Sequence, residues 1–555
     1  MPSMTGKRAL MECLSAHGVE IIFGNPGSTE SPIMDALVDH PSIRYVLALQ
    51  ETPVVSMADG YARASGRAAF ANVHIAPGLA NAISQLYNAY RGGTPLILTA
   101  GQADSRMEQE EPSLSADLVR MTRQFTKWSA EVSHAADLPM VIRRAFKVAL
   151  EPPTGPVFIS LPWDALDEEF VPDPSDLLPP PEAYRRARPD AAGVHRAATL
   201  LAEARQPIVV AGDRLAQSGG MAALVRVAEL LGAPVYLGSR SQPVFPTSHP
   251  LFAGSIGPAN RDVFARADVV LAVGANLFNS FLYTPRGVIP PTTRLIQLDS
   301  SAWEVGRVYA AEVGLVADPR AGLEDLADAL EEALTRERRD EALARVARAR
   351  AERSSRREDI ARRARDRWDA VPIAPARLAI ELRARFPENG LLVEEAITTS
   401  AVLHQAFDFS SPGEHYSHRG GAIGWGPGGA VGVQLARPER RVVAVIGDGS
   451  SAYSFQALWT AAHLRLPMTY VICSNRSYRI LKVNLARYRG EQATGPDRFL
   501  GMDLNDPPID FARLAEGFGV QSRRVERPAD LGPALAEAFQ TPGPSLVDVV
   551  IDGSL

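Results

Sequence analysis

The sequence is poor in the residues that define several protein classes. Only two cysteines, Cys13 and Cys473, occur in 555 residues, so we expect neither a disulfide framework nor a cysteine metal cluster. No apolar stretch reaches the ~18 residues of a membrane-spanning helix. The first residues carry charges where a signal peptide needs an uninterrupted apolar core. These absences predict a protein of a reducing, cytoplasmic compartment with no membrane segment.

The sequence also lacks an excess of either charge. It has 58 basic and 64 acidic residues, a net charge of −6 and a pI near 6.0, which gives no electrostatic case for binding a nucleic acid or an acidic membrane surface. An apolar content of 46% and a charged content of 22% are ordinary for a globular protein and argue against disorder. The length allows about three domains of ~150–200 residues.

Buried strands alternate with helices along the chain. We expect strands at residues 19–23, 45–49, 69–74, 96–99 and 157–161, at 208–211, 235–237, 269–273 and 294–298, and at 391–394, 442–446, 468–473 and 546–551. Helices should begin near Ser31, with Ser28, Thr29 or Ser31 as the cap, and cover residues 52–64, the stretch up to about residue 90, and 454–464. This alternation predicts an α/β fold of three doubly wound parallel-sheet domains.

Composition divides the chain into three parts. Residues 172–188 are rich in proline among acids and arginines, as linkers are. Residues 336–369 combine Arg, Glu, Asp and Ala, which predicts an exposed helix with opposite charges at helical spacing. We therefore expect an N-terminal domain at 1–180, a middle domain at 190–335 and a C-terminal domain at 370–555. The middle domain has no convincing flavin-binding glycine cluster, so we expect no FAD.

The motif that organises the chain is Gly447-Asp448-Gly449, which follows a buried strand. Asn475 follows the next buried strand, 27 residues after Asp448, which leaves room for one βαβ unit. Parallel strands of such a unit end at the same edge of the sheet and would bring the two side-chain oxygens together. Hard oxygens in this position suit Mg²⁺ held jointly with phosphates. The alternative is a ligand-free turn, because Asp-Gly is common in turns.

Two further polar residues follow expected strands of the N-terminal domain. Glu51 comes after the apolar run at 45–49 and precedes a helix poor in charge. It could be a desolvated carboxylate suited to proton transfer, or a solvated loop residue or helix cap. His74 stands at a strand end before Pro77-Gly78 and could act on a ligand at that edge, or be a hydrogen-bonded structural histidine. The spacing alone does not choose between these readings.

Together these features resemble the thiamine diphosphate-dependent enzymes of the pyruvate decarboxylase and acetolactate synthase superfamily, and within it most of all the benzoylformate decarboxylases. The resemblance covers essentially the whole length. Besides the Gly-Asp-Gly and Asn motif, it is carried by FGNPGS at 23–28, LALQE at 47–51, ADGYA at 58–62, TAGQ at 99–102, KWS at 127–129, GVQLA at 432–436 and ALWTAA at 457–462.

The resemblance implies how the C-terminal domain would hold the cofactor. Asp448, Asn475 and the main chain of Ser477 would bind Mg²⁺ on the diphosphate of thiamine diphosphate. The diphosphate itself would contact Gly447, Gly449, Ser450 and Thr398. Ile423 would support the bent form of the cofactor, and the carbonyl of Gly421 would accept a hydrogen bond from the aminopyrimidine.

The resemblance also implies roles for the N-terminal domain. Glu51 would bond the pyrimidine ring and promote the imino tautomer that generates the ylid nucleophile. Ser28 would bind the substrate carboxylate, and His74 would assist proton transfers. Because Glu51 and Asp448 come from different subunits in the family, the active unit is expected to be at least a homodimer, with a homotetramer as in many relatives. The implied reaction is decarboxylation of a 2-oxo acid through an enamine intermediate to an aldehyde.

The sequence departs from the benzoylformate decarboxylases in three places. Phe281 occupies the position of their second catalytic histidine, so either another acid protonates the enamine or the enamine attacks an aldehyde acceptor, which is carboligation. His415 and His418 precede the glycine-rich stretch, and His418 is a candidate replacement acid–base group, although both could be surface histidines. Arg479 and Lys482 replace apolar residues and favour a more polar or anionic substrate.

Three hypotheses therefore remain open at this point. The first is a thiamine diphosphate- and Mg²⁺-dependent lyase that decarboxylates a 2-oxo acid. The second is a carboligase or C–C lyase acting on 2-hydroxy ketones or 2-hydroxyacyl compounds. The third is a binding or assembly subunit without catalysis, against which the presence of Glu51, Asp448 and Asn475 argues.

Overall fold

The computed structural model describes residues 2–177, 186–238, 241–278, 283, 287–490 and 499–555. These residues form two compact units. One unit comprises Met1–Glu182, Arg367–Ala406 and Tyr416–Leu555, and the other comprises Ala183–Asp366 with Phe407–His415. Each unit is built on parallel six-stranded sheets, two in the first unit and one in the second. The expected α/β fold with three parallel-sheet domains is thereby confirmed.

The N-terminal sheet has the strand order β3-β2-β4-β5-β7-β6, with every neighbouring pair parallel. Its strands are β2 (Ile21–Gly24), β3 (Arg44–Leu47), β4 (Ala69–Val73), β5 (Leu96–Gln102), β6 (Trp128–Glu131) and β7 (Val157–Pro162). Its helices are α1 (Gly6–Ala16), α2 (Ser31–Val38), α3 (Glu51–Ser65), α4 (Ile75–Gly92), α5 (Leu118–Thr122), α6 (Leu138–Leu150) and α7 (Trp163–Asp167), and a short antiparallel pair joins β1 (Met4–Thr5) to β8 (Glu169–Phe170).

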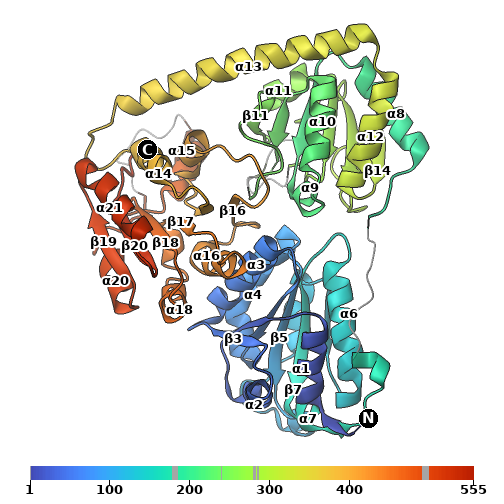
Figure 1. The fold of residues 1–555 in the computed structure, drawn as a ribbon, viewed down its shortest axis with the longest axis vertical. Helices are drawn as coiled ribbons and strands as arrows, with labels where there is room; N and C mark the ends of the chain where they lie inside the picture. Colours follow the sequence, from blue (N-terminus) through green and yellow to red (C-terminus); the bar gives the residue numbers. More distant parts are fainter. Residues whose placement is uncertain (1, 178–185, 239–240, 279–282, 284–286, 491–498) are drawn as a thin grey trace. The chain divides into compact units, whose positions relative to one another are not determined.

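Apolar side chains that alternate along the strands are buried on both faces of this sheet. Ile22 packs with α1 and α6, whereas its neighbour Phe23 packs with α3 and α4. Figure 1 shows these two helix pairs around the sheet. A parallel sheet covered on both faces buries nearly every strand residue, and this is why the strands read as continuous apolar runs in the sequence.

The C-terminal sheet repeats the same order of strands, β16-β15-β17-β18-β20-β19. Its strands are β15 (Leu391–Glu395), β16 (His415–Ser417), β17 (Val442–Gly447), β18 (Thr469–Ser474), β19 (Gln521–Val525) and β20 (Ser545–Val550). Its helices are α14 (Pro375–Arg385), α15 (Ser400–Ala406), α16 (Trp425–Ala436), α17 (Asp448–Ser451), α18 (Ala457–His463), α19 (Arg479–Arg489), α20 (Phe511–Gly517) and α21 (Pro528–Gln540).

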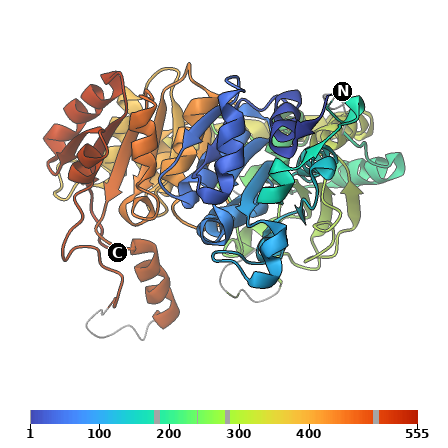
Figure 2. The same cartoon turned by 90° about the horizontal axis from the view of Figure 1, so that it is seen from below.

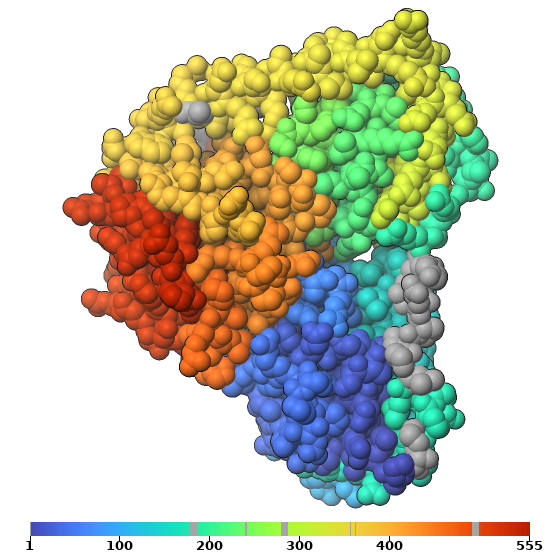
Figure 3. Space-filling model, viewed as in Figure 1, coloured from blue at the N-terminus to red at the C-terminus, as the bar shows by residue number. Residues whose placement is uncertain are grey.

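Helices α3 and α16 join the N- and C-terminal domains through an unusually close contact. A Cβ added to Gly432 would collide with the main chain of Met57, and one added to Gly60 would collide with the main chain of Gly429. The Trp425 indole N–H donates to the buried Asp59 carboxylate over 2.7 Å. The blue and orange parts of the chain meet directly in Figures 2 and 3. Glycines on both helices are required for this packing.

The middle domain contains the third sheet, with the order β11-β10-β9-β12-β13-β14. Its strands are β9 (Pro207–Ala211), β10 (Val235–Leu237), β11 (Phe252–Ser255), β12 (Val269–Val273), β13 (Arg294–Asp299) and β14 (Val313–Val316). Its helices are α8 (Ala191–Glu203), α9 (Asp213–Gln217), α10 (Met221–Leu231), α11 (Arg261–Arg266), α12 (Pro319–Ala333) and α13 (Arg336–Arg365). The long charged helix expected from the sequence is α13, an exposed yellow ridge in Figure 3.

Several local expectations differ from the structure. The short strands β6, β11, β14, β16 and β19 were not predicted, because edge strands carry weak apolar patterns. The expected serine or threonine cap near residue 31 is wrong, since the N-cap residue of α2 is Glu30 and its side chain makes no capping hydrogen bond to that helix. The Glu30 carboxylate instead accepts the N–H of Gly27 over 2.8 Å. Helix α4 already begins at Ile75, because Pro77 is tolerated in a first turn.

The remaining expectations concern cysteines, membrane helices and the linker. Cys13 and Cys473 are both buried and free. Within the described parts of the chain, no helix combines the length and apolarity needed to cross a bilayer. Of the predicted linker, residues 178–185 lie outside the described residues, as does Phe281.

Candidate active site

The predicted site residues follow strands that flank a reversal of strand order. In the N-terminal sheet the order reverses between β2 and β4, and in the C-terminal sheet it reverses between β15 and β17. Open α/β sheets bind ligands outside the carboxyl ends of the strands at such switch points. Ser28 and His74 follow β2 and β4, whereas Thr398 and Asp448 follow β15 and β17. Both sheets therefore present polar groups where the topology leaves a crevice.

Asp448 and Asn475 directly follow the adjacent parallel strands β17 and β18, in which Gly447 is paired with Cys473. The Asp448 carboxylate accepts the N–H groups of Gly449 over 2.8 Å and Arg476 over 2.6 Å. The Asn475 side-chain oxygen accepts the N–H of Ser477 over 2.9 Å. These hydrogen bonds hold two hard oxygens at one edge of the sheet, as the sequence predicts.

The electrostatics of this edge favour a cation. Asp448 is only 4% exposed, and burial raises its pKa to about 6 despite the hydrogen bonds from Gly449 and Arg476. Among the described residues no cationic side chain forms an ion pair with it. A buried carboxylate without a counter-ion, next to a carboxamide oxygen, is a donor set that fits Mg²⁺. Gly449 has to be glycine, because a Cβ there would lie 2.5 Å from the Tyr478 ring.

Residues 420–424 form a glycine-rich loop that is held from both domains. Gly420, Gly421 and Gly424 have φ values of +84°, +102° and +93°, which L side chains rarely adopt. Asn88 of α4 holds Ala422 through two hydrogen bonds of 2.7 and 3.0 Å. Gln85 of the same helix donates to the carbonyl of Ile423 over 3.1 Å. The main chain around Gly421 and Ile423 is thereby fixed in place.

Glu395, which the sequence analysis did not single out, fixes this loop from the other side. Its carboxylate accepts the N–H groups of Gly424 over 2.9 Å and Gly426 over 2.7 Å at the start of α16. It is completely buried at the end of β15, and burial raises its pKa to about 8. Thr398 lies half-buried in the turn after β15, next to Ile397, whose φ is +34°.

His74 is held by a second glutamate that sequence reasoning assigned no role. Its Nδ1 lies 2.8 Å from Glu30 Oε2 and 3.2 Å from Thr29 Oγ1. The Glu30 carboxylate is completely buried and also accepts the N–H groups of Gly27 and Gly101. With Nδ1–H bonded to a carboxylate, Nε2 is the ring nitrogen left available to accept or donate a proton. The only sequence signal for Glu30 is a charged residue inside the turn after a buried strand.

Glu51 is the first residue of α3 and is 8% exposed. Its carboxylate accepts a hydrogen bond of 3.0 Å from the side chain of Asn81 on α4. A Cβ on Gly78 would lie 2.8 Å from Glu51 Oε1, so the glycine makes room for the carboxylate. The preceding residue, Gln50, caps the helix by accepting the N–H of Thr52. The Glu51 carboxylate is thus buried and takes no part in capping α3, which Gln50 caps instead.

The remaining predicted residues of the site, Ser28 and His418, are more exposed or make fewer hydrogen bonds. Ser28 is exposed, and His418 is half-buried with Nδ1 3.5 Å from Ser417 Oγ. Burial lowers the pKa of His418, while Glu394 opposes this shift. His415 is 1% exposed and stacks on Phe409, so it is not a surface histidine.

Helix α19 buries none of its residues, and Figure 2 shows it apart from the C-terminal sheet. On this helix Arg479 Nε donates to the carbonyl of Ser554, and Lys482 forms an ion pair with Asp503. Both cations therefore already have partners within the chain. No hydrogen bond or ion pair among the described residues joins Glu51 to Asp448 or Asn475.

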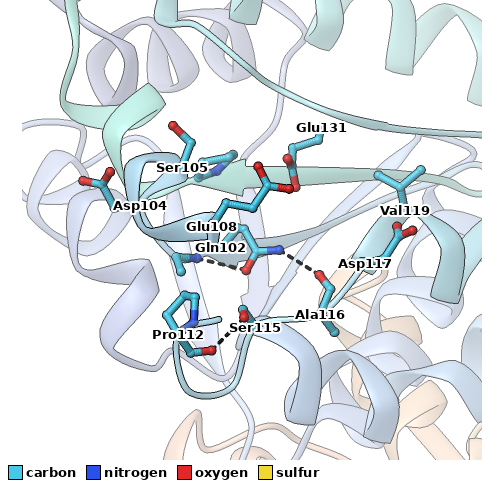
Figure 4. Close-up of a pocket in the computed structure, with 12 residues that line it drawn as sticks. Gln102, Asp104, Ser105, Glu108, Pro112, Ser115, Ala116, Asp117, Val119 and Glu131 are labelled. Carbon is cyan, nitrogen blue, oxygen red and sulfur yellow. Dashed lines mark hydrogen bonds between the residues drawn. The ribbon is translucent and has the colours of Figure 1, made fainter. Parts of the chain in front are cut away.

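A cavity of about 300 Å³ lies near the carboxyl ends of β5, β6 and β7 (Figure 4). Its wall includes Asp104, Glu108, Asp117 and Glu131. Gln102 closes one side by donating to the carbonyl of Ala116 over 3.0 Å. Gln102, which lines the cavity, directly follows Gly101, whose N–H donates to Glu30.

Comparison with known proteins relates these features to a family. Models of the thiamine pyrophosphate enzymes match residues 4–126 as the N-terminal TPP binding domain, 194–326 as the central domain and 396–549 as the C-terminal TPP binding domain. The chain is 32% identical to a benzoylformate decarboxylase of Pseudomonas aeruginosa, over 98% of each chain. It is 26% identical to a glyoxylate carboligase of Escherichia coli O157:H7, over 100% of this chain and 93% of that one.

Among solved structures, the chain is similar to the thiamine diphosphate-dependent 4-hydroxybenzoylformate decarboxylase of Rhodococcus jostii RHA1. The TM-score is 0.86 with 31% identity, and the match covers 99% of both chains.

Proposed function

Because the chain belongs to the family of thiamine pyrophosphate enzymes, we propose that it decarboxylates a 2-oxo acid to an aldehyde with thiamine diphosphate and Mg²⁺. The observation that carries the proposal is the pairing of His74 with the buried Glu30 at the switch point of the N-terminal sheet. Similarity to two decarboxylases over nearly the whole chain supports it. The benzoylformate class of substrate is the first to test.

The residues of the C-terminal edge would hold the cofactor. Asp448, Asn475 and the carbonyl of Ser477 would bind Mg²⁺, and the chain around Gly449, Ser450 and Thr398 would meet the diphosphate. When bound, thiamine diphosphate supplies the carbon nucleophile and the electron sink that cleavage next to a carbonyl requires. The loop with Gly421 and Ile423, fixed by Asn88 and Glu395, would orient it.

The residues of the N-terminal edge would move protons. Glu51, oriented by Asn81, would bind a ring nitrogen of the cofactor and share a proton with it. His74, with Nδ1 bonded to Glu30, would exchange a proton at Nε2. Ser28 is exposed at the same edge, and its hydroxyl would donate a hydrogen bond to the substrate carboxylate.

The decisive experiment separates decarboxylation from carboligation. Purified protein loaded with thiamine diphosphate and Mg²⁺ is incubated with a panel of aromatic and aliphatic 2-oxo acids, with and without an aldehyde acceptor, and the products are identified. We expect CO₂ and the matching aldehyde without acceptor. Protein stripped of cofactor is the control. Hydroxy ketone from every substrate that reacts, with no free aldehyde, would contradict the proposal.

Carboligation is the second candidate, favoured by the position of Phe281. Phenylalanine carries no transferable proton, so it cannot serve as the acid that releases the aldehyde. We expect Phe281→Leu, which also carries no transferable proton, to leave the ratio of aldehyde to hydroxy ketone unchanged within about twofold, and Phe281→His to raise that ratio several-fold. An equal ratio in both variants would show that position 281 does not decide the outcome.

We further propose that the active unit is at least a homodimer, with a homotetramer as the larger form. Among the described residues no hydrogen bond or ion pair joins Glu51 to Asp448, which agrees with a site completed by a second subunit. Tyr488 on α19 and Leu500 further along the chain are strongly exposed apolar side chains that a partner could cover. When Glu51→Gln and Asp448→Asn variants are mixed in equal amounts under exchange conditions, about half of the dimers are hybrids and each hybrid has one intact site. The mixture should therefore regain about a quarter of the wild-type activity. Hybrid dimers without any regained activity would place both residues in one subunit's site.

A further inference from the structure

The middle domain contains a cleft that the proposed reaction does not use. It has a volume of about 450 Å³ and lies at the amino ends of β9, β10 and β12, where Pro207, Pro234 and Ala267 contribute to its wall. Helices α11 and α13 form its sides, and Figure 1 shows α13 passing α10 and α11. Cofactors of open α/β sheets bind at the opposite, carboxyl edge. The cleft is therefore separate from the cofactor edge of its own sheet.

The charged side chains that line this cleft are mostly positive. Arg205, Arg266, Arg345 and Arg348 line it, and Glu352 is the only acid among the lining residues. The chain as a whole has the opposite balance, with a net charge of −6. Four guanidinium groups around one cavity repel each other, and an anion bound between them would relieve this repulsion.

Two of the arginines have no acidic partner. Within the described residues, no ion pair involves the guanidinium of Arg205 or of Arg348, even though Glu352 follows Arg348 by one helical turn. Asp268 directly precedes β12. Its carboxylate accepts the backbone N–H groups of Arg205 over 2.6 Å and Gln206 over 3.0 Å. Arg266 forms an ion pair with Asp262 one turn earlier on α11, at 3.2 Å. Arg345 forms an ion pair of 3.7 Å with Glu341 of α13. Arg205 and Arg348 are therefore the cationic side chains of the cleft that have no acidic partner within the described residues.

Arg345 is the fixed element of the cleft. Its guanidinium donates to the carbonyl of Leu231 at the end of α10 over 2.7 and 3.2 Å, which anchors α13 to α10. Its side chain is only 18% exposed, and burial lowers its pKa. A held guanidinium with unpaired neighbours is pre-organised for bidentate contacts to phosphate or carboxylate oxygens.

We propose that this cleft binds a small anion with two acidic groups, such as a diphosphate ester or a dicarboxylate. One acidic group would lie between Arg345 and Arg348 of α13, and the other would reach Arg205 before β9. Because the ligand would join α13 to the strand ends of the sheet, binding would stabilise the middle domain. The volume accommodates a ligand larger than inorganic phosphate, with Tyr236 as an aromatic wall.

The test measures binding to the holoenzyme, with the cofactor sites already saturated by thiamine diphosphate and Mg²⁺. Magnesium pyrophosphate and malonate are titrated by calorimetry at constant ionic strength, and their comparison distinguishes a phosphate from a carboxylate ligand. The double variant Arg205→Gln/Arg348→Gln is compared with Arg336→Gln/Arg350→Gln. The control pair removes the same two charges from exposed positions of α13 that do not line the cleft.

We expect at least one of the two probes to bind the wild type and the control pair, and to raise the Tm of both. Affinity should fall about 10-fold or more in Arg205→Gln/Arg348→Gln, while turnover without the probe stays unchanged. Circular dichroism and gel filtration identify a variant that fails to fold, and in that case Arg348→Gln alone replaces the pair. Equal weakening in both double variants would show diffuse attraction only, and no binding of either probe to the wild type would overturn the proposal.

Discussion

The N- and C-terminal domains have the same strand order but present different chemistry at the same edge. In both, the first strand of the sheet neighbours the third, and polar residues follow those strands. The N-terminal edge carries Glu51 and the Glu30–His74 pair, whereas the C-terminal edge carries Asp448 and Asn475. The topology thus determines where a ligand can bind, and a few side chains after the strands determine what each edge can do.

The two edges also use glycine differently. At the N-terminal edge, Gly27 and Gly78 have ordinary backbone conformations and leave room for the His74 ring and the Glu51 carboxylate. At the C-terminal edge, Gly421 and Gly424 adopt positive φ values that shape the loop itself. Substitutions at the first edge should therefore disturb proton transfer, and those at the second should disturb cofactor binding.

The largest effect is expected from Asp448→Asn at the C-terminal edge. The substitution removes the negative charge that would hold Mg²⁺, so we expect thiamine diphosphate to bind at least 100-fold more weakly and activity to be lost at ordinary cofactor concentrations. Calorimetric titration of apoprotein with cofactor and Mg²⁺ measures this. Asp530→Asn, an acid on α21, is the control. Normal cofactor affinity in Asp448→Asn would disprove the metal role.

The next effect separates the two edges. We expect Glu51→Gln to bind thiamine diphosphate normally but to lose its C2 proton exchange, with turnover reduced by about 10²–10⁴-fold. Proton exchange followed by NMR and cofactor titration measure the two quantities independently. Glu20→Gln, an exposed acid before β2, is the control. Exchange at the wild-type rate would contradict the role of Glu51.

A smaller effect is expected from Gly27→Ala. The added Cβ would collide with the His74 ring and displace it from Glu30. Because misplacing a proton-transfer group costs about 10–10²-fold, kcat should fall while cofactor affinity stays normal. Gly543→Ala is the matched control, since a Cβ at Gly543 meets nothing within 4 Å. Equal kcat values for the two variants would argue against the Glu30–His74 pair.

The smallest effect concerns the stability that His418 contributes. Burial lowers its pKa in the folded state, so the unfolded state binds the proton first as the pH falls below the unfolded pKa of ~6.5. The free energy of unfolding then falls by up to ~1.4 kcal/mol per pH unit until the pH reaches the pKa of His418 in the folded state. Urea unfolding at pH 7.5 and 5.5 should show a smaller loss in His418→Gln than in the wild type. Identical losses would mean that His418 is not desolvated.

Much of the architecture could be predicted from local pattern. The apolar runs ending at Gly447 and near Ser474 are buried parallel strands, and the charged stretch after residue 336 is a long helix. A strand buried on both faces consists almost entirely of apolar residues and an exposed helix almost entirely of polar ones, so both can be recognised from composition. Edge strands such as β6 and β19 were not predicted, because half-exposed strands mix polar and apolar residues and show no continuous apolar run.

The sequence by itself determined the family, the fold class and the edge on which Asp448 and Asn475 meet, because these depend on short motifs and on the periodicity of burial. Only the tertiary structure decided that Glu30 holds His74, that Asn81 orients Glu51 and that Glu395 fixes the loop before α16. These contacts join residues 29 to 44 positions apart, and no local pattern encodes which distant polar group a buried carboxylate will find.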